Sequence, residues 1–164
     1  MAELYLLDTC IYGVLVDKKH GDYERVEKIL EYAKKHREMF ISTLIIFDEI
    51  NKMDDVILEI VYPEYINTSS AMIEQIISNK YSEVKKLAWR YIQKLGIVDA
   101  KKIYHDALNY SWACYSGTNV FITLNRRYIL SKEFQPTLKQ INEEMRVKYV
   151  KIMTPKEFLM FLRF

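Results

Sequence analysis

The sequence has little of the chemistry that marks several common protein classes. Its 164 residues include only two cysteines, three histidines, four glycines and three prolines. Cys10 and Cys114 form neither a CxxC motif nor a cysteine–histidine spacing, so the sequence indicates neither a zinc site nor a disulfide scaffold. Two unpatterned thiols are typical of a reducing cytosol. The scarcity of glycine and proline, together with the lack of repeats, excludes a low-complexity chain.

Long apolar runs are also missing. No stretch approaches the roughly 18 apolar residues that span a membrane, and the N-terminus lacks the basic region and apolar core of a signal peptide. We therefore expect a cytoplasmic protein that does not enter a membrane. The net charge of +2 is too small to indicate a nucleic-acid binder by itself.

What the chain does have is hydrophobic residues, which make up 50% of it. That is enough for the core of one domain over residues 1–164. The central stretch is the apolar run 4–7, which stops at Asp8. Such a run is typical of a strand buried on both faces, as in a parallel sheet covered by helices.

Asp8 therefore stands at the carboxyl end of the first predicted strand. Ligands of open α/β sheets bind beyond these strand ends, so an acid here is well placed for chemistry. The competing interpretation is that Asp8 only caps the next helix. Other acids that converge on Asp8 would favour the functional interpretation.

Strands and helices alternate along the rest of the chain. Apolar residues at helical spacing predict helices over 22–38, 44–53, 70–95 with a break near Asn79, 99–115 and 136–145. Short apolar runs predict strands over 39–43, 120–124 and 147–153. A capping box over 154–157, with proline at the first helical position, predicts a final helix through Phe161. Pro63 is expected to end a helix, with a short strand after it at 65–67. This order predicts an α/β fold, a three-layer sandwich with a mainly parallel central sheet flanked by helices.

Two acids interrupt the apolar faces of predicted helices. Glu49 lies four residues after Ile45, and Asp106 lies three residues after Ile103. A carboxylate on an inward face is unfavourable unless it is paired or holds a cation. A buried salt bridge is the alternative role for Glu49.

Asp8, Glu49 and Asp106 can meet in one cleft of such a fold. Three carboxylates close together do not all stay ionised without a compensating cation. Oxygen ligands prefer hard cations such as Mg²⁺ or Mn²⁺ over zinc, and such ions serve phosphodiester hydrolysis by activating water and neutralising phosphate charge. Spacing alone thus predicts a metal-dependent phosphotransfer or hydrolase site and nothing narrower.

Further polar residues follow the predicted strands. Asn125 ends one strand, and Arg126 and Arg127 come directly after it. The two arginines are the best candidates to bind a nucleic-acid backbone by charge. Thr9 and Thr123 are candidates for positioning phosphate or water, although threonine at a strand end more often packs or caps.

Five short motifs, in order, resemble the signatures of PIN domains. They are LLDT at residues 6–9, IS at 41–42 followed by Glu49, HDAL at 105–108, FITLN at 121–125 and TPKEFL at 154–159. The resemblance spans nearly the whole chain. Among PIN domains, the motifs most resemble those of archaeal and bacterial VapC-type toxins and their relatives.

The resemblance implies that Asp8, Glu49 and Asp106 bind Mg²⁺ or Mn²⁺ in an endoribonuclease that cleaves single-stranded RNA. It also implies the toxin of a toxin–antitoxin pair, often a homodimer, inhibited by a small cognate antitoxin. Asn125 stands where a fourth aspartate is common, and Cys10 where serine or asparagine is frequent. We assign Asn125 to catalysis with the three acids, but asparagine adds no charge, so a second ion is expected to bind weakly.

Two other functions stay open. A PIN-like module with weak or no catalysis, binding RNA or a protein, is compatible with the missing fourth acid. A phosphotransfer domain with an aspartyl intermediate is disfavoured, because haloacid-dehalogenase-like enzymes need a second aspartate where Cys10 stands. Receiver domains need an acidic pair after this strand and a lysine after the last one, and neither is evident.

A regular apolar stripe runs along the helix predicted to end at Leu95. Its residues are Val84, Leu87, Ala88, Tyr91, Ile92 and Leu95. This regularity indicates core packing first and a subunit interface second. From the stripe and the resemblance, we expect a homodimer that associates through helices rather than through sheet edges.

Overall fold

The computed structural model describes residues 2–96 and 99–164 and contains a four-stranded parallel sheet. The strands are β1 (Tyr5–Leu7), β2 (Phe40–Ile41), β3 (Val120–Ile122) and β4 (Lys151–Met153), in the order β2-β1-β3-β4. Leu6 of β1 lies opposite Ile41 on one side and Phe121 on the other. The central strands β1 and β3 are buried along their whole length, as expected of a covered parallel sheet.

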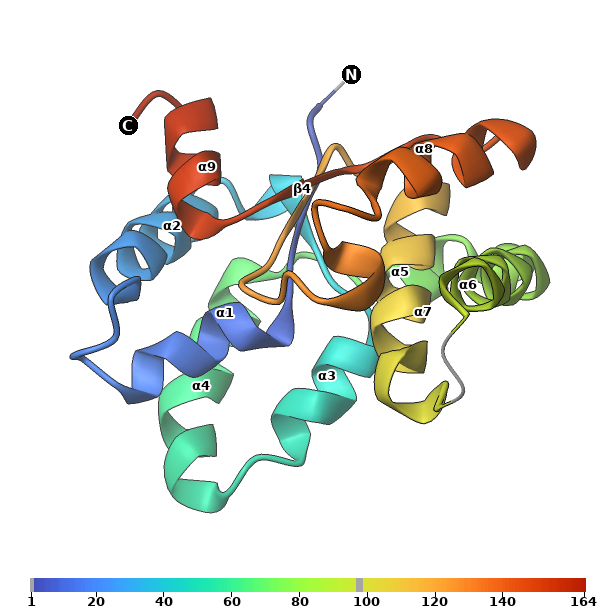
Figure 1. The fold of residues 1–164 in the computed structure, drawn as a ribbon. Helices are drawn as coiled ribbons and strands as arrows, with labels where there is room; N and C mark the ends of the chain where they lie inside the picture. Colours follow the sequence, from blue (N-terminus) through green and yellow to red (C-terminus); the bar gives the residue numbers. More distant parts are fainter. Residues whose placement is uncertain (1, 97–98) are drawn as a thin grey trace.

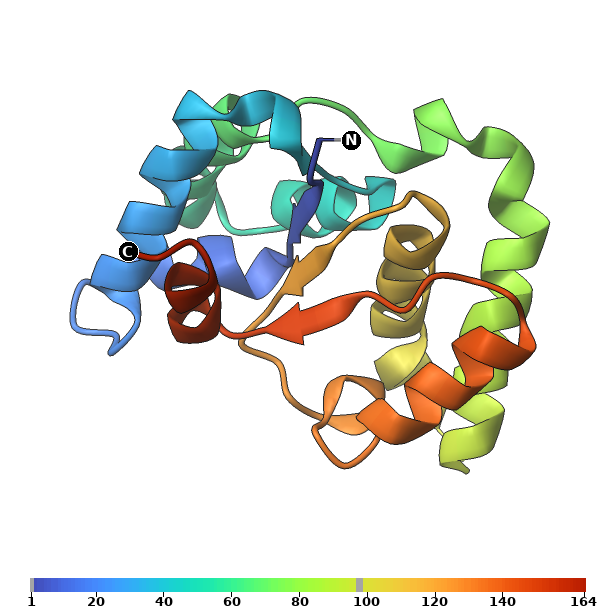
Figure 2. The same cartoon turned by 90° about the horizontal axis from the view of Figure 1, so that it is seen from above.

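Helices cover both faces of this sheet. Those in the described ranges are α1 (Thr9–Gly13), α2 (Tyr23–Lys35), α3 (Leu44–Asn51), α4 (Asp55–Thr68), α5 (Ile73–Ile76), α6 (Tyr81–Leu95), α7 (Lys101–Tyr115), α8 (Gln135–Glu144) and α9 (Pro155–Phe161). Figures 1 and 2 show α2 and α9 on one side of the sheet and α6, α7 and α8 on the other. This arrangement confirms the predicted three-layer α/β sandwich. In the part of the chain that the structure describes, no helix has the length and apolar character needed to cross a membrane.

The carboxyl ends of the strands meet where α1 and α3 begin. β1 leads directly into α1, and β2 leads into α3, which contacts both α1 and α7. In Figure 1 this is the lower edge of the sheet, with α1 and α7 on either side of α3. Residues at the ends of β1 and β3, and on the helices α3 and α7, are therefore brought to one region.

The helix that contains Pro63 is a correction to the sequence prediction. α4 continues through Pro63 to Thr68, so no strand forms at 65–67. A proline inside a helix removes one hydrogen bond and crowds the preceding turn. Tertiary contacts offset this cost, because Tyr65 and Thr68 are buried and the Tyr65 hydroxyl donates to Ser42 Oγ at 3.0 Å.

The apolar stripe of α6 packs in the core, as its regular spacing predicted. Val84, Leu87, Ala88, Tyr91 and Ile92 are no more than 3% exposed, and Leu95 is partly buried against the core. The stripe contributes to the core, where α6 packs against α7 (Figure 2). It is therefore not available to a second copy of the chain, and self-association remains a prediction without this surface.

Candidate acidic site

Asp8 is a buried carboxylate at the end of the central strand β1. Its side chain is 6% exposed. Oδ1 accepts a hydrogen bond from the Thr9 backbone N–H at 2.9 Å, and Oδ2 accepts one from the Thr123 hydroxyl at 2.8 Å. Burial raises the pKa of the Asp8 carboxyl, and these hydrogen bonds partly offset the rise. Asp8 therefore caps α1 and also presents an acid where ligands of such sheets bind.

Glu49 faces Asp8 from α3. The helix begins after Thr43, whose hydroxyl accepts the Ile46 backbone N–H at 3.1 Å and donates to Asn109 Oδ1 of α7 at 2.6 Å. These bonds fix the start of α3 against α7. Burial raises the pKa of the Glu49 carboxyl, and the negative charge of Asp8 raises it further. The two acids are thus close enough to repel each other.

Asp106 of α7 completes the acidic group. Burial, followed by the charges of Asp8 and Glu49, raises the pKa of its carboxyl to about 7. Its Oδ2 accepts a hydrogen bond from Asn125 Nδ2 at 3.0 Å, which lowers the pKa only in part. The structure therefore brings together all three acids that the sequence predicts, from the end of β1, from α3 and from α7.

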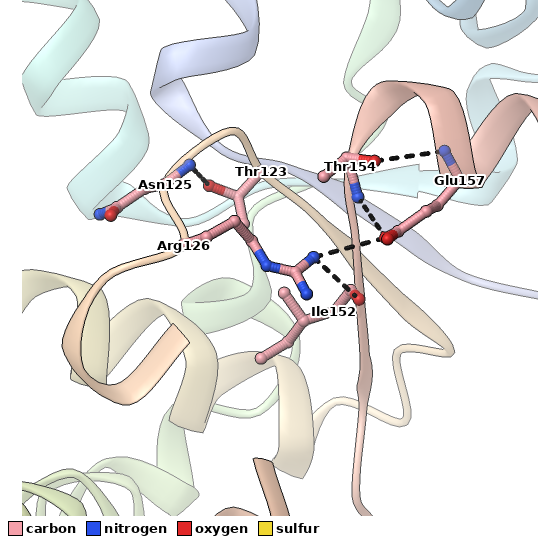
Figure 3. Close-up of polar contacts among 6 residues, drawn as sticks. All are labelled: Thr123, Asn125, Arg126, Ile152, Thr154 and Glu157. Carbon is pink, nitrogen blue, oxygen red and sulfur yellow. Dashed lines mark hydrogen bonds and ion pairs between the residues drawn. The ribbon is translucent and has the colours of Figure 1, made fainter. Parts of the chain in front are cut away.

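Asn125 orients Asp106 by donating to it. Its own Oδ1 accepts the Arg127 backbone N–H at 3.2 Å, and its backbone N–H donates to Thr123 Oγ1 at 2.9 Å. Figure 3 shows the bond to Thr123, from which the Asn125 side chain extends away from Glu157. An ionised aspartate at this position has no donor for Asp106 and adds repulsion. At this position a side-chain amide is therefore compatible with a nearby ionised Asp106, whereas a fourth acid would repel it.

The two threonines have different roles. Thr123 is fully buried, and its hydroxyl donates to Asp8 and accepts from the Asn125 backbone N–H. Thr123 therefore supports the site from inside the protein. Thr9 Oγ1 is also buried but makes no hydrogen bond within the described residues. The Thr9 side chain nevertheless lies near enough to the Glu49 carboxyl to lower its pKa in part by polar interaction, so the hydroxyl faces the acids without a well-formed hydrogen bond to them. Of the two, Thr9 has the hydroxyl that is left for a water or a phosphate.

Cys10 also belongs to this cluster, although the sequence prediction did not assign it a role. Its Sγ lies 3.3 Å from Thr123 Oγ1 and 3.6 Å from Asp8 Oδ2, and it accepts the Leu124 backbone N–H at 3.3 Å. Burial and the Asp8 charge raise the pKa of the thiol to about 12, so Cys10 stays neutral. Its position two residues after Asp8 was the one signal of this role in the sequence.

Arg126 and Arg127 point in different directions. Arg126 extends toward β4 and α9, where Nη1 lies 3.4 Å from Glu157 Oε2 and 3.5 Å from the Ile152 carbonyl oxygen (Figure 3). Glu157 also accepts the Thr154 backbone N–H in the capping box of α9. Arg126 therefore links the loop after β3 to the C-terminal helix, whereas Arg127 is exposed.

Replacing the two arginines one at a time is expected to lower the stability in one variant and the RNA affinity in the other. Arg126→Ala removes a partly buried ion pair and should lower the free energy of unfolding by about 1 kcal/mol. Arg127→Ala should leave the melting temperature unchanged but weaken RNA binding and reduce the salt dependence of log Kd by about one unit. Thermal melts and fluorescence anisotropy at low and high salt measure both effects, with the exposed Lys28→Ala of α2 as the charge control. An equal loss of stability in both variants would contradict this division.

The ligand atoms of the acidic site suit a hard divalent cation. Three carboxylates and the unpaired hydroxyl of Thr9 supply oxygen only, which is what Mg²⁺ and Mn²⁺ prefer. Within residues 2–96 and 99–164, however, no group of three or more acidic, histidine or cysteine side chains is already spaced to hold a metal ion. The acids are electrostatic neighbours, but they are not yet arranged as ligands around one point.

Comparisons with protein-family models, with curated proteins and with solved structures find no match to this chain.

Proposed function

We propose that the protein is a metal-dependent endoribonuclease of the PIN type that cleaves single-stranded RNA. The observation that carries the proposal is a buried group of acids, Asp8, Glu49 and Asp106, in which burial first and then the charges of Asp8 and Glu49 raise the pKa of Asp106 to about 7. Among the described residues, Lys52 is the one basic side chain that opposes these rises in pKa, and it does so at Glu49. Uncompensated acids of this kind are typical of functional sites that bind a cation.

The mechanism assigns Asp8, Glu49 and Asp106 as the ligands of Mg²⁺ or Mn²⁺. When bound, the ion would supply positive charge at the scissile phosphate and lower the pKa of the attacking water. Asp8 is held in place by Thr123 and by the first turn of α1, so it is the fixed ligand. Glu49 and Asp106 are partly exposed, and the hydrogen bond from Asn125 holds the Asp106 carboxylate in place.

Substrate contacts are assigned to the two polar residues that the fold does not use. Thr9 has a buried hydroxyl without a hydrogen-bond partner in the described chain, and we propose that it positions a phosphate oxygen or a water. Arg127 is exposed on the loop after β3 and attracts the RNA backbone by charge. Thr123 and Arg126, which the sequence placed in the same group, are supporting residues in this proposal.

Cleavage of a mixed-sequence RNA tests the proposal directly. Wild-type protein should cut the RNA with Mn²⁺ or Mg²⁺ but not with EDTA, and Asp8→Asn should lower the rate by about a thousandfold because a charged ligand is lost. Asp48→Asn is the matched control, since Asp48 is an exposed acid next to Glu49 on α3. Cleavage that persists in EDTA or in Asp8→Asn would point to a contaminant or to another mechanism.

A PIN-like module that binds RNA or a protein without cutting is the second candidate. One observation in its favour is that Asn125 carries an amide in place of a fourth acid. A second is that, among residues 2–96 and 99–164, no group of acids is spaced to hold a metal ion. RNA that binds the wild type but stays intact in Mn²⁺ would support this alternative.

The biological role and assembly are proposed from the motif resemblance. We propose that the chain is the toxin of a toxin–antitoxin pair, with a small cognate antitoxin as partner, and that it forms a homodimer. Light scattering at micromolar concentration tests self-association, and a monodisperse monomer would count against it.

A further inference from the structure

We infer that an aromatic pair on α6 and α7, exposed Trp89 packed on half-buried Tyr104, stacks against an unpaired base of a single-stranded nucleic acid. The pair consists of Trp89 and Tyr104 and lies outside the acidic group. The inference rests on the proposed function for the identity of the ligand. It adds the part of the surface that selects a single strand.

The geometry of the pair suits stacking. The ring centroids of Trp89 and Tyr104 are 5.2 Å apart, with an angle of 40° between the ring planes. Trp89 is 44% exposed, in contrast to Trp112, which is 2% exposed in the core. Together with Ala100, Lys101 and His105, the pair lines an open pocket of about 430 Å³. Part of the Trp89 indole is therefore accessible to a flat ligand.

One lysine lines this pocket, and a second lies one helical turn from Trp89. Lys86 lies on the same side of α6 as Trp89, three residues before it, and is exposed, as is Lys101 in the pocket wall. Neither lysine takes part in an ion pair among the residues that the structure describes. Asp99, the acid nearest to Lys101 in sequence, is not among the lining residues.

This combination favours a nucleic acid over a protein partner. Apolar docking grooves for proteins are lined by several aliphatic side chains, whereas Ala100 is the one aliphatic residue among those lining this pocket. Aromatic rings flanked by lysines are typical of surfaces that bind single strands, because the rings stack on bases and the lysines attract phosphates.

The pocket and the acidic site share α7. His105 lines the pocket, and the next residue along α7 is Asp106. Consecutive residues project about 100° apart around a helix, so a strand that reaches both sites must pass around α7. A base on Trp89 must first leave its own stack, which a duplex resists. This requirement gives a physical reason for selectivity toward single strands.

Tryptophan fluorescence provides the test, because Trp89 and Trp112 are the two tryptophans of the chain. We expect a mixed-sequence single-stranded RNA, added in EDTA so that metal-dependent cleavage does not occur, to quench the exposed Trp89. Trp89→Ala should weaken binding by about tenfold in anisotropy measurements, the loss of one stacked base. Trp89→Phe should retain most of the affinity, since a phenyl ring also stacks.

Controls separate stacking from charge and from misfolding. Duplex RNA and an abasic DNA strand should not quench Trp89, whereas the same DNA strand with its bases should. Tyr62→Ala removes an exposed aromatic side chain of α4, on a different part of the molecule, and should bind RNA as the wild type does. Thermal melts of each variant identify any loss of affinity that follows from unfolding.

Three outcomes overturn the inference. The first is wild-type affinity in a folded Trp89→Ala variant, which would leave this surface to a protein partner. The second is quenching of Trp89 by the abasic strand that is as strong as quenching by its parent strand. The third is a loss of affinity in Tyr62→Ala that equals the loss in Trp89→Ala. RNA that binds through Trp89 but stays intact in Mn²⁺ would instead contradict the nuclease proposal alone. Cleavage that is indifferent to Trp89 would contradict this inference alone.

Discussion

Asp106→Asn is expected to make the metal-free protein more stable at neutral pH while abolishing its cleavage of RNA. Asparagine keeps the shape of the side chain and still accepts the hydrogen bond from Asn125. It removes a charge that burial, Asp8 and Glu49 all disfavour. The catalytic loss follows because a charged ligand of the proposed cation is gone.

The pH dependence of this effect has a definite sign. The pKa of Asp106 is raised in the folded state to about 7 from 3.8. A raised carboxyl pKa contributes stability that is complete below the unfolded value and is lost as pH rises through the folded one. Above pH 7 the wild type should have lost about 2 kcal/mol, half of the roughly 4 kcal/mol that the full shift represents, because Asp106 is partly exposed.

Thermal melts in EDTA between pH 5 and pH 8 measure the difference. The melting temperature of the wild type should fall across this range relative to that of Asp106→Asn, since the variant has no carboxyl to titrate at this position. Asp48→Asn, which changes an exposed acid, should follow the wild type. A variant that melts well below the wild type at pH 8 would show that Asp106 is a structural partner, and the metal-site proposal would then be abandoned.

Mn²⁺ is expected to produce the largest change in stability of the unmodified protein. An ion that binds only the folded state, at 100 times its Kd, stabilises by about 2.7 kcal/mol. For a domain of this size that corresponds to a rise in melting temperature of about 5 to 10 °C. The ion also neutralises the repulsion among Asp8, Glu49 and Asp106, so the wild type should gain most above pH 7.

Two matched variants test whether the effect of Mn²⁺ comes from this site. Asp8→Asn should show almost no rise in melting temperature with Mn²⁺, because it removes the proposed metal ligand at the end of β1, which Thr123 holds in place. Asp48→Asn should respond like the wild type, since its carboxylate is exposed on α3. Similar shifts in all three proteins would indicate weak binding at other acids and would count against this site.

Local sequence determined the elements whose signals lie within a few residues. The apolar run before Asp8 predicted β1, and the residues Thr154, Pro155 and Glu157 predicted the capping box and first turn of α9, which the structure confirms. Gly96 ends α6 with a φ of 73°, a conformation that glycine adopts without a steric cost. Such signals can be interpreted from sequence because the interacting groups are neighbours in the chain.

Part of the candidate site could also be predicted from the sequence. Spacing placed Glu49 and Asp106 on the inward faces of their helices, but it could not show that both face Asp8. Their convergence depends on the packing of α3 and α7 against the carboxyl end of β1, which the start of α3 at Thr43 helps to fix.

Only the tertiary structure decided how the remaining polar groups are used. The Thr123 hydroxyl reaches Asp8 across 115 positions of the chain, and Arg126 reaches Glu157 across 31. Packing likewise carries α4 through Pro63. The sequence shows which side chains are able to donate, accept or stack. Which of them meet depends on the order β2-β1-β3-β4, since contacts between distant residues are set by packing and not by local preference.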